Sequence, residues 1–324
     1  MGLFNFNTDG LTEEQLSFLK YKAMEGLSDN TLYGYSKTFK VFNDEVEFPE
    51  DLEEWVSEDF SKELSEEILN FFYKRRDLKG GYNGYRKRLS TYFRYLIQQG
   101  IIKDNPIKVA NIKMKKEGAE PRPAQKENLQ LIINAIDQKT YVGFRDYVYI
   151  LLSIDTGIRP AEVVQVYKGL FNFQDKELKI TPSIGKCNKS RILPVSDYVI
   201  KEVKRLFDLS IKYNFKSSNL LLSNSGDKIT TTSLQRRLQF YCKLLDFGEE
   251  DKTTPYMLRH YFATAYLENG GNIVYLQYLM GHADIKMTKK YLKINQEAVS
   301  EEHRRYSPVN DILEDRSRIN RIVL

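Results

Sequence analysis

Three short stretches in the last third of the chain decide its interpretation: Thr254-Pro-Tyr-Met-Leu-Arg-His260, Leu279-Met-Gly-His282 and Thr288-Lys-Lys-Tyr291. The first lies early in an expected helix, and the second follows the end of another helix at a stop glycine. An arginine, a histidine and a tyrosine at these separations are what a protein needs to bind a phosphodiester and attack it with a phenol. Each residue alone also fits a structural role, so the joint order carries the prediction that the protein cuts and rejoins DNA.

A second arginine comes from an upstream motif, Thr156-Gly-Ile-Arg159-Pro-Ala-Glu162. Pro160 is typical of a first helical turn, so Arg159 is expected at a helix N-terminus, where anions bind. There its guanidinium can hold phosphate oxygens through two hydrogen bonds, or it can pair with Glu162 three residues later. Both interpretations can hold at once.

A lysine comes from the stretch 179–195, which is expected to form two short strands around a tight turn at Gly185 and Asn188. Lys186 in this turn can reach a groove and donate a proton to a leaving oxygen, with Lys189 as the second choice. A solvated surface lysine is the alternative interpretation.

The composition of the 324-residue chain fits two domains, because 41% hydrophobic residues can build a core in each. The formal charge of +5 favours a polyanionic partner only weakly, since 44 acidic residues are mixed with 49 basic ones. Cys187 and Cys242 have no metal-ligand spacing and the chain holds three histidines, so no metal site is expected. Because the sequence has neither a signal peptide nor an apolar run of about 20 residues, we expect a cytoplasmic protein that does not enter a membrane.

Residues 11–106 are expected to form a small unit of four helices. Thr12 is placed to cap the first helix. The third helix is expected over 61–74 and the fourth over about 82–99. The residues expected to face inward are Leu16, Leu19 and Ala23 in the first helix, Leu32, Tyr35, Phe39 and Phe42 in the second, and Leu89, Phe93, Leu96 and Ile97 in the fourth.

Basic residues gather on and before the fourth of these helices. The acidic residues of this unit concentrate between Asp44 and Glu67, so the basic residues are expected to form a surface of one sign that binds DNA phosphates. A solvated helix face is the alternative. The predicted DNA-binding residues of this unit are Lys74, Arg75, Arg76, Arg86, Lys87, Arg88 and Arg94.

A lysine-rich stretch without apolar periodicity, residues 107–124, is expected to be an extended linker. Linkers that cross DNA are often basic, so Lys113, Lys115 and Lys116 complete the predicted DNA-binding residues. The following block, residues 125–297, combines helical patterns with a strand-rich patch between Leu178 and Val195. The expected fold is mainly α with a small β-sheet.

The motifs around Arg159, Lys186, Arg259, His282 and Tyr291, in this order and at these intervals, resemble the catalytic domain of the tyrosine recombinase family, the phage integrases and Xer-type enzymes. The N-terminal helical unit is similar to the core-binding domain of that family, so the resemblance covers nearly the whole chain. It implies a C-shaped clamp, with a four-helix core-binding domain and a mixed α/β catalytic domain on opposite faces of duplex DNA.

The resemblance also implies a role for each matching residue. It implies that Arg159 and Arg259 bind the scissile phosphate and that His282 assists this contact. Lys186 would be the general acid, and Tyr291 would be the nucleophile. His260 and Glu162 become supporting residues. Because a phosphotyrosine bond keeps the energy of the ester, strand exchange would need no cofactor, neither ATP nor a divalent metal.

One departure from the family concerns Tyr256, which stands three positions before Arg259, where the family usually has histidine. Tyrosine can hydrogen-bond a phosphate or orient the nucleophile, but it cannot act as a base at neutral pH as imidazole can. Tyr256 is therefore included among the candidate catalytic residues, as a second phenol that could compete for the roles assigned to Tyr291.

The two ends of the chain extend the prediction to assembly. Residues 1–10 are expected to be a short N-terminal tail, too short for the additional domain with which some integrases bind distant arm sites. Residues 298–324 combine a charged stretch with an apolar end, and in the resembled family such a tail docks into a neighbouring protomer. We therefore expect a homo-oligomer, a tetramer when two duplexes are paired.

The expected function is that of a site-specific DNA recombinase, an integrase or transposase of a mobile element. It would act on double-stranded DNA with inverted-repeat core sites through a covalent 3′-phosphotyrosine intermediate. Three alternatives remain open: an Xer-type chromosome-dimer resolvase, a type IB topoisomerase and a non-catalytic DNA-binding protein of the same fold.

Overall fold

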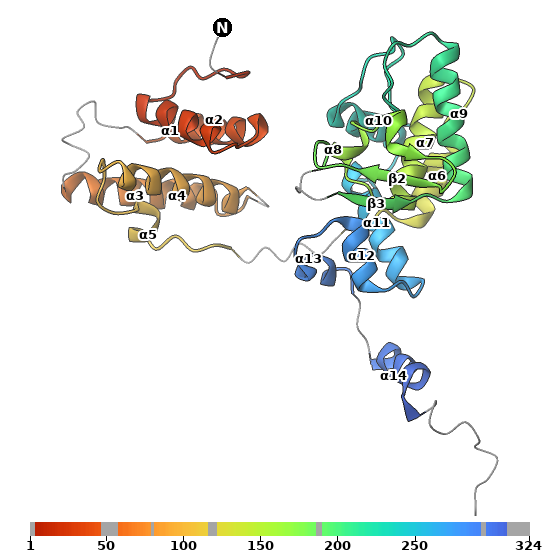
Figure 1. Ribbon diagram of the computed structural model, residues 1–324. Helices are drawn as coiled ribbons and strands as arrows, with labels where there is room; N and C mark the ends of the chain where they lie inside the picture. Colours follow the sequence, from red (N-terminus) through yellow and green to blue (C-terminus); the bar gives the residue numbers. More distant parts are fainter. Residues whose placement is uncertain are drawn as a thin grey trace, which may run out of the picture. The chain divides into compact units, whose positions relative to one another are not determined.

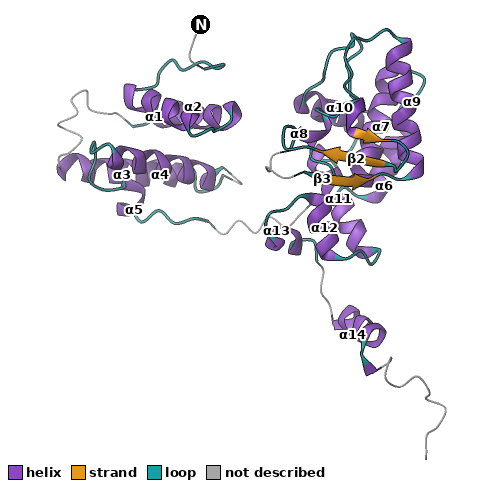
Figure 2. Ribbon diagram, in the orientation of Figure 1, coloured by secondary structure: helices purple, strands orange, loops and turns teal. Residues whose placement is uncertain are grey.

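A computed structural model gives the architecture of the chain and describes residues 4–46, 58–78, 81–115, 122–185, 190–292 and 296–309. The chain divides into two compact units, Met1–Ala119 and Glu120–Leu324. Both units are mainly helical, and the second also contains a small sheet (Figures 1 and 2). The predicted fold class, mainly α with a small β-sheet, is confirmed.

The first unit packs its helices around a core of aromatic rings. Its elements are α1 (Glu13–Met24), α2 (Asp29–Asn43), α3 (Glu58–Lys74), α4 (Tyr82–Gln98) and the short α5 (Pro106–Val109). Phe18 of α1 is fully buried and makes edge-on contacts with Phe39 of α2 and Tyr92 of α4. Such edge-to-face pairs add to the stabilisation that comes from burying the rings.

Local signals in α1 agree only in part with the expectation. Thr12 does cap the helix, because its hydroxyl accepts a hydrogen bond from the backbone of Gln15 and the Gln15 side chain bonds back to the Thr12 backbone. The expected inward face is wrong at Ala23, which is exposed. Leu19 is buried as expected, and Phe18 fills the core in place of Ala23, since burying an aromatic ring removes more apolar area from water.

The segment after α4 is not a linker over its whole expected length. Ile107 and Ile112 are buried in the core of the first unit. Asn83 of α4 exchanges two hydrogen bonds of 2.9 Å with the backbone of Lys115. Burial of these apolar side chains therefore holds residues 107–115 against the helices, and residues 116–121 lie outside the described residues.

The second unit combines an antiparallel sheet with helices. Its strands, β1 (Phe171–Asn172), β2 (Glu177–Ile180) and β3 (Arg191–Pro194), pair in the order β1-β2-β3. The expected hairpin is β2 and β3, with Ile180 paired to Arg191, whereas β1 was not expected. The helices are α6 (Lys126–Ala135), α7 (Tyr141–Thr156), α8 (Pro160–Val163), α9 (Asp197–Lys212), α10 (Thr231–Leu244), α11 (Pro255–Glu268), α12 (Ile273–Met280), α13 (Ile285–Lys289) and α14 (Gln296–Tyr306).

Helix α7 is the central helix of the second unit and packs against α9 and α11 (Figure 1). It ends at Gly157, whose φ of 63° lies in the left-handed region that favours glycine. A Cβ at this position would lie 2.2 Å from the ring of Phe262 in α11. The glycine therefore lets the chain turn from α7 into α8 while staying close to α11.

A buried ionic network joins α7 to α10. Asp146 accepts hydrogen bonds from Arg145 at 2.6 and 3.0 Å, from Arg237 at 2.6 Å and from the Tyr241 hydroxyl at 3.0 Å. Asp146 is 1% exposed and Arg145 is 4% exposed. Charges this deep are tolerated because they are paired and hydrogen-bonded.

We expect Asp146→Asn to lower the free energy of unfolding by about 3 kcal/mol, because it removes the charge that compensates two guanidinium groups and leaves both in place. Urea denaturation followed by circular dichroism measures this change. The matched control is Asp208→Asn on the exposed side of α9, which should change stability by less than about 0.5 kcal/mol. Equal losses in the two variants would contradict the prediction.

Candidate active site

Arg159 lies between the end of α7 and the start of α8. It immediately precedes Pro160, the first residue of α8, as expected from the sequence. Its side chain is 14% exposed and donates hydrogen bonds of 3.0 Å to Glu162 and 2.6 Å to the carbonyl of Gly281. The guanidinium therefore connects α8 to the residue that ends α12.

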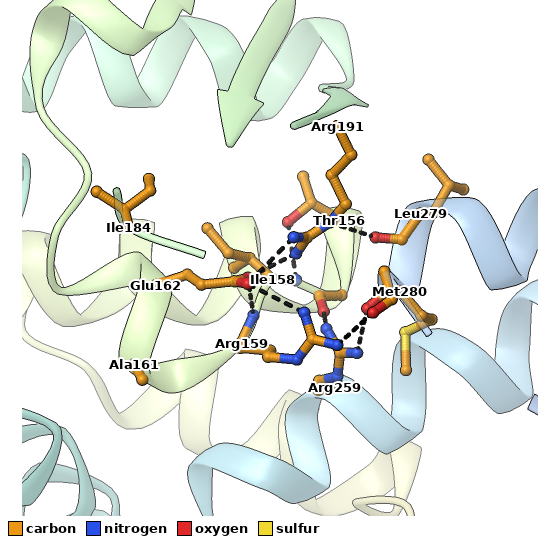
Figure 3. A network of polar contacts seen from close by, with 12 residues as sticks. Thr156, Ile158, Arg159, Ala161, Glu162, Ile184, Arg191, Arg259, Leu279 and Met280 are labelled. Atoms are coloured by element: carbon orange, nitrogen blue, oxygen red, sulfur yellow. Dashed lines mark hydrogen bonds and ion pairs between the residues drawn. The ribbon is translucent and has the colours of Figure 1, made fainter. Parts of the chain in front are cut away.

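Arg259 reaches the same place from α11. It is 4% exposed and donates hydrogen bonds to the carbonyls of Gly157 at 2.5 Å and Met280 at 2.6 Å (Figure 3). Burial and the positive charge of Arg159 lower the pKa of Arg259 to about 9, so the group still carries its charge at neutral pH. Guanidinium groups held this close create a positive potential suited to an anion.

The carboxylate of Glu162 holds this cluster together. It is 1% exposed and accepts hydrogen bonds from the backbone and guanidinium of Arg159 and two more from Arg191, at 3.1 and 2.5 Å (Figure 3). Burial acts to raise the pKa of Glu162, but the hydrogen bonds and charge of Arg191 outweigh it, and the pKa lies below its ordinary value. Glu162 is therefore ionised at neutral pH.

Arg191 is a residue of the cluster that sequence reasoning treated only as part of a strand. It opens β3, is 5% exposed, and donates a hydrogen bond of 3.0 Å to the carbonyl of Leu279 in α12 (Figure 3). One signal was present in the sequence. Arg191 lies two positions before the inward Leu193, so both side chains are on the same face of the strand, where a charge needs a buried partner. Which residue is that partner is decided by the fold.

His282 follows Gly281, the left-handed residue that ends α12. Its Nε2 lies 3.2 Å from Nη2 of Arg259, and its Nδ1 lies 2.9 Å from the hydroxyl of Thr288. Because a guanidinium can only donate, we assign Nε2 as the acceptor and place the ring proton on Nδ1. Burial and the charge of Arg259 lower the pKa of His282 to about 4, so the ring is neutral at pH 7. Thr288 was not identified from the sequence as part of the site.

Tyr291 lies just after α13, and its ring lies beside two histidines. The residue is 8% exposed, and its hydroxyl lies 2.7 Å from Nδ1 of His260. Its ring is stacked on that of His282 with an interplanar angle of 7°. Burial raises the pKa of Tyr291 while the charges of Arg259 and Arg159 act to lower it, and the pKa remains above its ordinary value. The phenol is therefore protonated at neutral pH, beside the guanidinium cluster.

One predicted site residue is not joined to this cluster, and another lies outside the described residues. Tyr256 lies in the first turn of α11 with 58% of its surface exposed, and its hydroxyl shares no hydrogen bond with the other described site residues. Lys186, together with the second choice Lys189, lies outside the described residues. The strands on either side of that turn, β2 and β3, are paired as predicted.

The expected separation of acidic from basic residues in the first unit is wrong at Glu45. Its carboxylate pairs with Arg75 and, at 3.2 Å, with Lys74. The guanidinium of Arg75 also covers the ring of Phe71, 3.6 Å from its centroid. Glu45 follows the end of α2, and packing brings this end beside the end of α3, which sequence distance does not reveal.

Other residues of the predicted DNA surface are also engaged within the unit. Arg86 donates to the carbonyl of Ile112 at 2.6 Å, and Arg88 donates to the hydroxyl of Thr38 at 3.2 Å. Lys116 lies outside the described residues. The members of the predicted set with exposed side chains are Lys74, Arg76, Lys87, Arg94, Lys113 and Lys115.

The chemistry of the cluster in the second unit is that of an anion site. Three guanidinium groups, from Arg159, Arg191 and Arg259, lie around one carboxylate, so positive charge is left for a ligand.

Among the described residues, no group of three or more histidine, cysteine or acidic side chains is arranged to hold a metal ion. No helix in the parts of the chain that the structure describes is long and apolar enough to cross a membrane.

We expect Arg191→Ala to lower the free energy of unfolding by about 3 to 5 kcal/mol, because it removes the bidentate partner of a buried carboxylate. Arg191→Lys should lose less, since an ammonium keeps the charge but cannot reproduce the fork of two hydrogen bonds. Urea denaturation measures both. Arg236→Ala, on the exposed side of α10, is the control. If Arg236→Ala lowered the free energy of unfolding as much as Arg191→Ala does, loss of the buried ion pair would not explain the effect.

We expect the stability of the chain to fall as the pH falls from about 6.5 toward 4. The pKa of His282 is about 4 in the folded chain and that of an ordinary histidine is 6.5, so in this window the unfolded chain binds a proton that the folded chain does not. The contribution is complete above pH 6.5. The midpoints of urea denaturation at pH 7.5 and 5.5 measure this loss of stability. His282→Asn should reduce the difference between the two midpoints. A midpoint that rises on acidification would contradict the prediction.

Comparison with known proteins identifies the family. The phage integrase family matches residues 124–298, more than half of the chain. The chain is 30% identical over 212 residues to tyrosine recombinase XerC of Alcanivorax borkumensis, which covers 64% of this chain and 66% of that protein. It is 24% identical over 306 residues to XerD of Listeria monocytogenes serotype 4b, which covers 92% of this chain and 98% of that protein.

Solved structures agree with this at the level of the fold. The Tn1549 transposon integrase in complex with a circular intermediate DNA superposes with a TM-score of 0.68 at 22% identity, covering 91% of this chain and 100% of that one. The lambda integrase bound to DNA superposes with a TM-score of 0.64 at 18% identity, covering 83% and 90%. The chain therefore belongs to the phage integrase family of tyrosine recombinases, enzymes that break and rejoin DNA.

Proposed function

We propose that the chain is a site-specific recombinase that cuts one DNA strand with Tyr291 and joins the 3′ phosphate to the phenolic oxygen. The observation that carries this proposal is the position of Tyr291 beside the cations of the anion site. The charges of Arg259 and Arg159 act to lower the pKa of Tyr291. Its ring stacks on that of His282, which is itself hydrogen-bonded to Arg259. A phosphodiester held by these arginines would lie next to the hydroxyl.

In this proposal each group has one task. Arg159 and Arg259 hold the nonbridging oxygens and stabilise the additional negative charge of pentacoordinate phosphorus. His282 orients Arg259 through their hydrogen bond and assists the phosphate contact. Lys186, which lies outside the described residues, acts as the general acid that protonates the departing 5′ oxygen.

Rejoining uses the same groups in reverse. The phosphotyrosine bond conserves the energy of the original ester, so the 5′ hydroxyl of another strand can displace the tyrosine. The exchange consumes no ATP and calls for no ligase, cofactor or divalent metal in the proposed mechanism.

We assign DNA binding to both units. Residues 11–106 would serve as the core-binding domain and residues 125–297 as the catalytic domain, each in contact with duplex DNA. The exposed Lys87 and Arg94 of α4 are the side chains of the first unit best placed for phosphate contacts, because the described residues offer them no competing ion pair. Exchange between two duplexes with inverted-repeat sites would use four copies, with residues 298–324 docked into neighbours.

We place the recombinase on a mobile element, as an integrase or transposase. The fold similarity to the Tn1549 transposon integrase supports this role. The second candidate is an Xer-type resolvase, which the sequence similarity to XerC and XerD favours. A plasmid carrying the gene with its flanking DNA separates the two roles, because a mobile-element enzyme would excise the gene as a circle with a rejoined junction, whereas a resolvase would leave the plasmid intact.

Tyr291→Phe should abolish a covalent adduct with a nicked suicide substrate built from the inverted repeats that flank the gene, because the nucleophile is lost while DNA binding is kept. Denaturing gels detect the adduct and gel shifts measure binding. Tyr213→Phe, at the end of α9 and 54% exposed, is the matched control and should form the adduct normally.

Other outcomes select other functions. An adduct with supercoil relaxation but no strand exchange would indicate a type IB topoisomerase. DNA binding by the unaltered chain with no adduct would indicate a binding protein and would refute the proposed chemistry.

A further inference from the structure

The hydroxyl of Tyr291 has one close imidazole neighbour that the proposed tasks leave unused. Nδ1 of His260 lies 2.7 Å from the phenolic oxygen, and the two ring centroids are 5.6 Å apart. His260 follows Arg259 in α11, whereas Tyr291 comes after α13, so the contact joins two separate elements of the second unit. Both side chains are shielded from solvent in part or in full.

The protonation state of His260 suits an acceptor. Burial and the charge of Arg259 lower the pKa of His260 below that of an ordinary histidine, so the ring is neutral at pH 7. A neutral imidazole has one nitrogen with a proton and one with a free lone pair. We assign the protonated phenol as the donor and Nδ1 as the acceptor, which places the lone pair on Nδ1, toward Tyr291.

The other candidates for this task are engaged elsewhere or are unsuited to it. Nε2 of His282 accepts from Arg259, and its Nδ1 is directed at Thr288, so that ring has no free lone pair for the phenol. Tyr256 is 58% exposed and cannot act as a base at neutral pH. Among the described residues, His260 is therefore the group placed to take the proton.

We propose that His260 is a catalytic residue, the general base that accepts the Tyr291 proton on Nδ1 as the phenolic oxygen attacks the scissile phosphate. This inference rests on the proposed function. The O–H bond of Tyr291 breaks as the Oη–P bond forms; the P–O5′ bond breaks, and the 5′ oxygen takes a proton from the ammonium assigned to Lys186. In rejoining, the imidazolium of His260 returns its proton to the phenolic oxygen as it leaves phosphorus.

The variant that separates a base from a mere hydrogen-bond partner is His260→Asn. Its amide can still bond to the Tyr291 hydroxyl but cannot take its proton. In single-turnover cleavage of the suicide substrate by the full chain, we expect the rate to fall by about 100-fold or more, since general-base catalysis contributes about 10² to 10⁴. DNA affinity and urea stability should stay close to those of the unaltered chain; if His260→Asn fails to fold, His260→Gln takes its place with the same expectation.

A second substrate distinguishes a base from an acid. Replacing the leaving 5′ oxygen by sulfur removes the need for an acid, because a thiolate leaves without protonation. We expect His260→Asn to remain slow on this substrate. Recovery of the unaltered rate would make His260 an acid and overturn the proposal, and so would unimpaired cleavage of the ordinary substrate by His260→Asn.

The outcome for the unaltered chain keeps this inference separate from the proposed function. If the unaltered chain forms no adduct, the proposed function fails and this inference fails with it. If the adduct forms, is lost in Tyr291→Phe and is unchanged in His260→Asn, only the role of His260 is refuted.

Discussion

The buried carboxylate of Glu162 is the interaction on which the site depends. It binds Arg159 from the start of α8 and Arg191 from β3, and these arginines continue to the carbonyls of Gly281 and Leu279 at the end of α12. A carboxylate that is 1% exposed is stable only when it is paired. The pairing therefore holds α8, the hairpin and the end of α12 in one arrangement, and His282 follows directly from it.

The same cluster sets the protonation states around it. Burial among like charges lowers the pKa of Arg259 to about 9 and that of His282 to about 4, because each added proton would increase a positive charge that is already in excess. The result is a cationic site lined by neutral imidazoles and a protonated phenol. Such a site favours an anion and leaves His260 able to accept a proton, so one electrostatic cause underlies both binding and the proposed chemistry.

Basic residues of the first unit show why a stretch rich in lysine and arginine need not form a positively charged surface. Arg75 is bound by Glu45 and covers the ring of Phe71, and Arg86 is bound to the carbonyl of Ile112. Long side chains can turn toward neighbouring elements and satisfy buried or half-buried acceptors there. The count of lysines and arginines along α4 contains no information about this choice, which depends on what packs beside the helix.

The sequence by itself determined most of the helices, the hairpin of β2 and β3, the family and the candidates Arg159, Arg259, His282 and Tyr291. These follow from signals that are local or ordered along the chain, such as helix periodicity, capping residues and the succession of motifs. Only the tertiary structure decided the partners: Arg191 with Glu162, 29 positions apart, and His260 with Tyr291, 31 positions apart. Each pair joins residues of different elements, and no local pattern specifies the distance between side chains that belong to different elements.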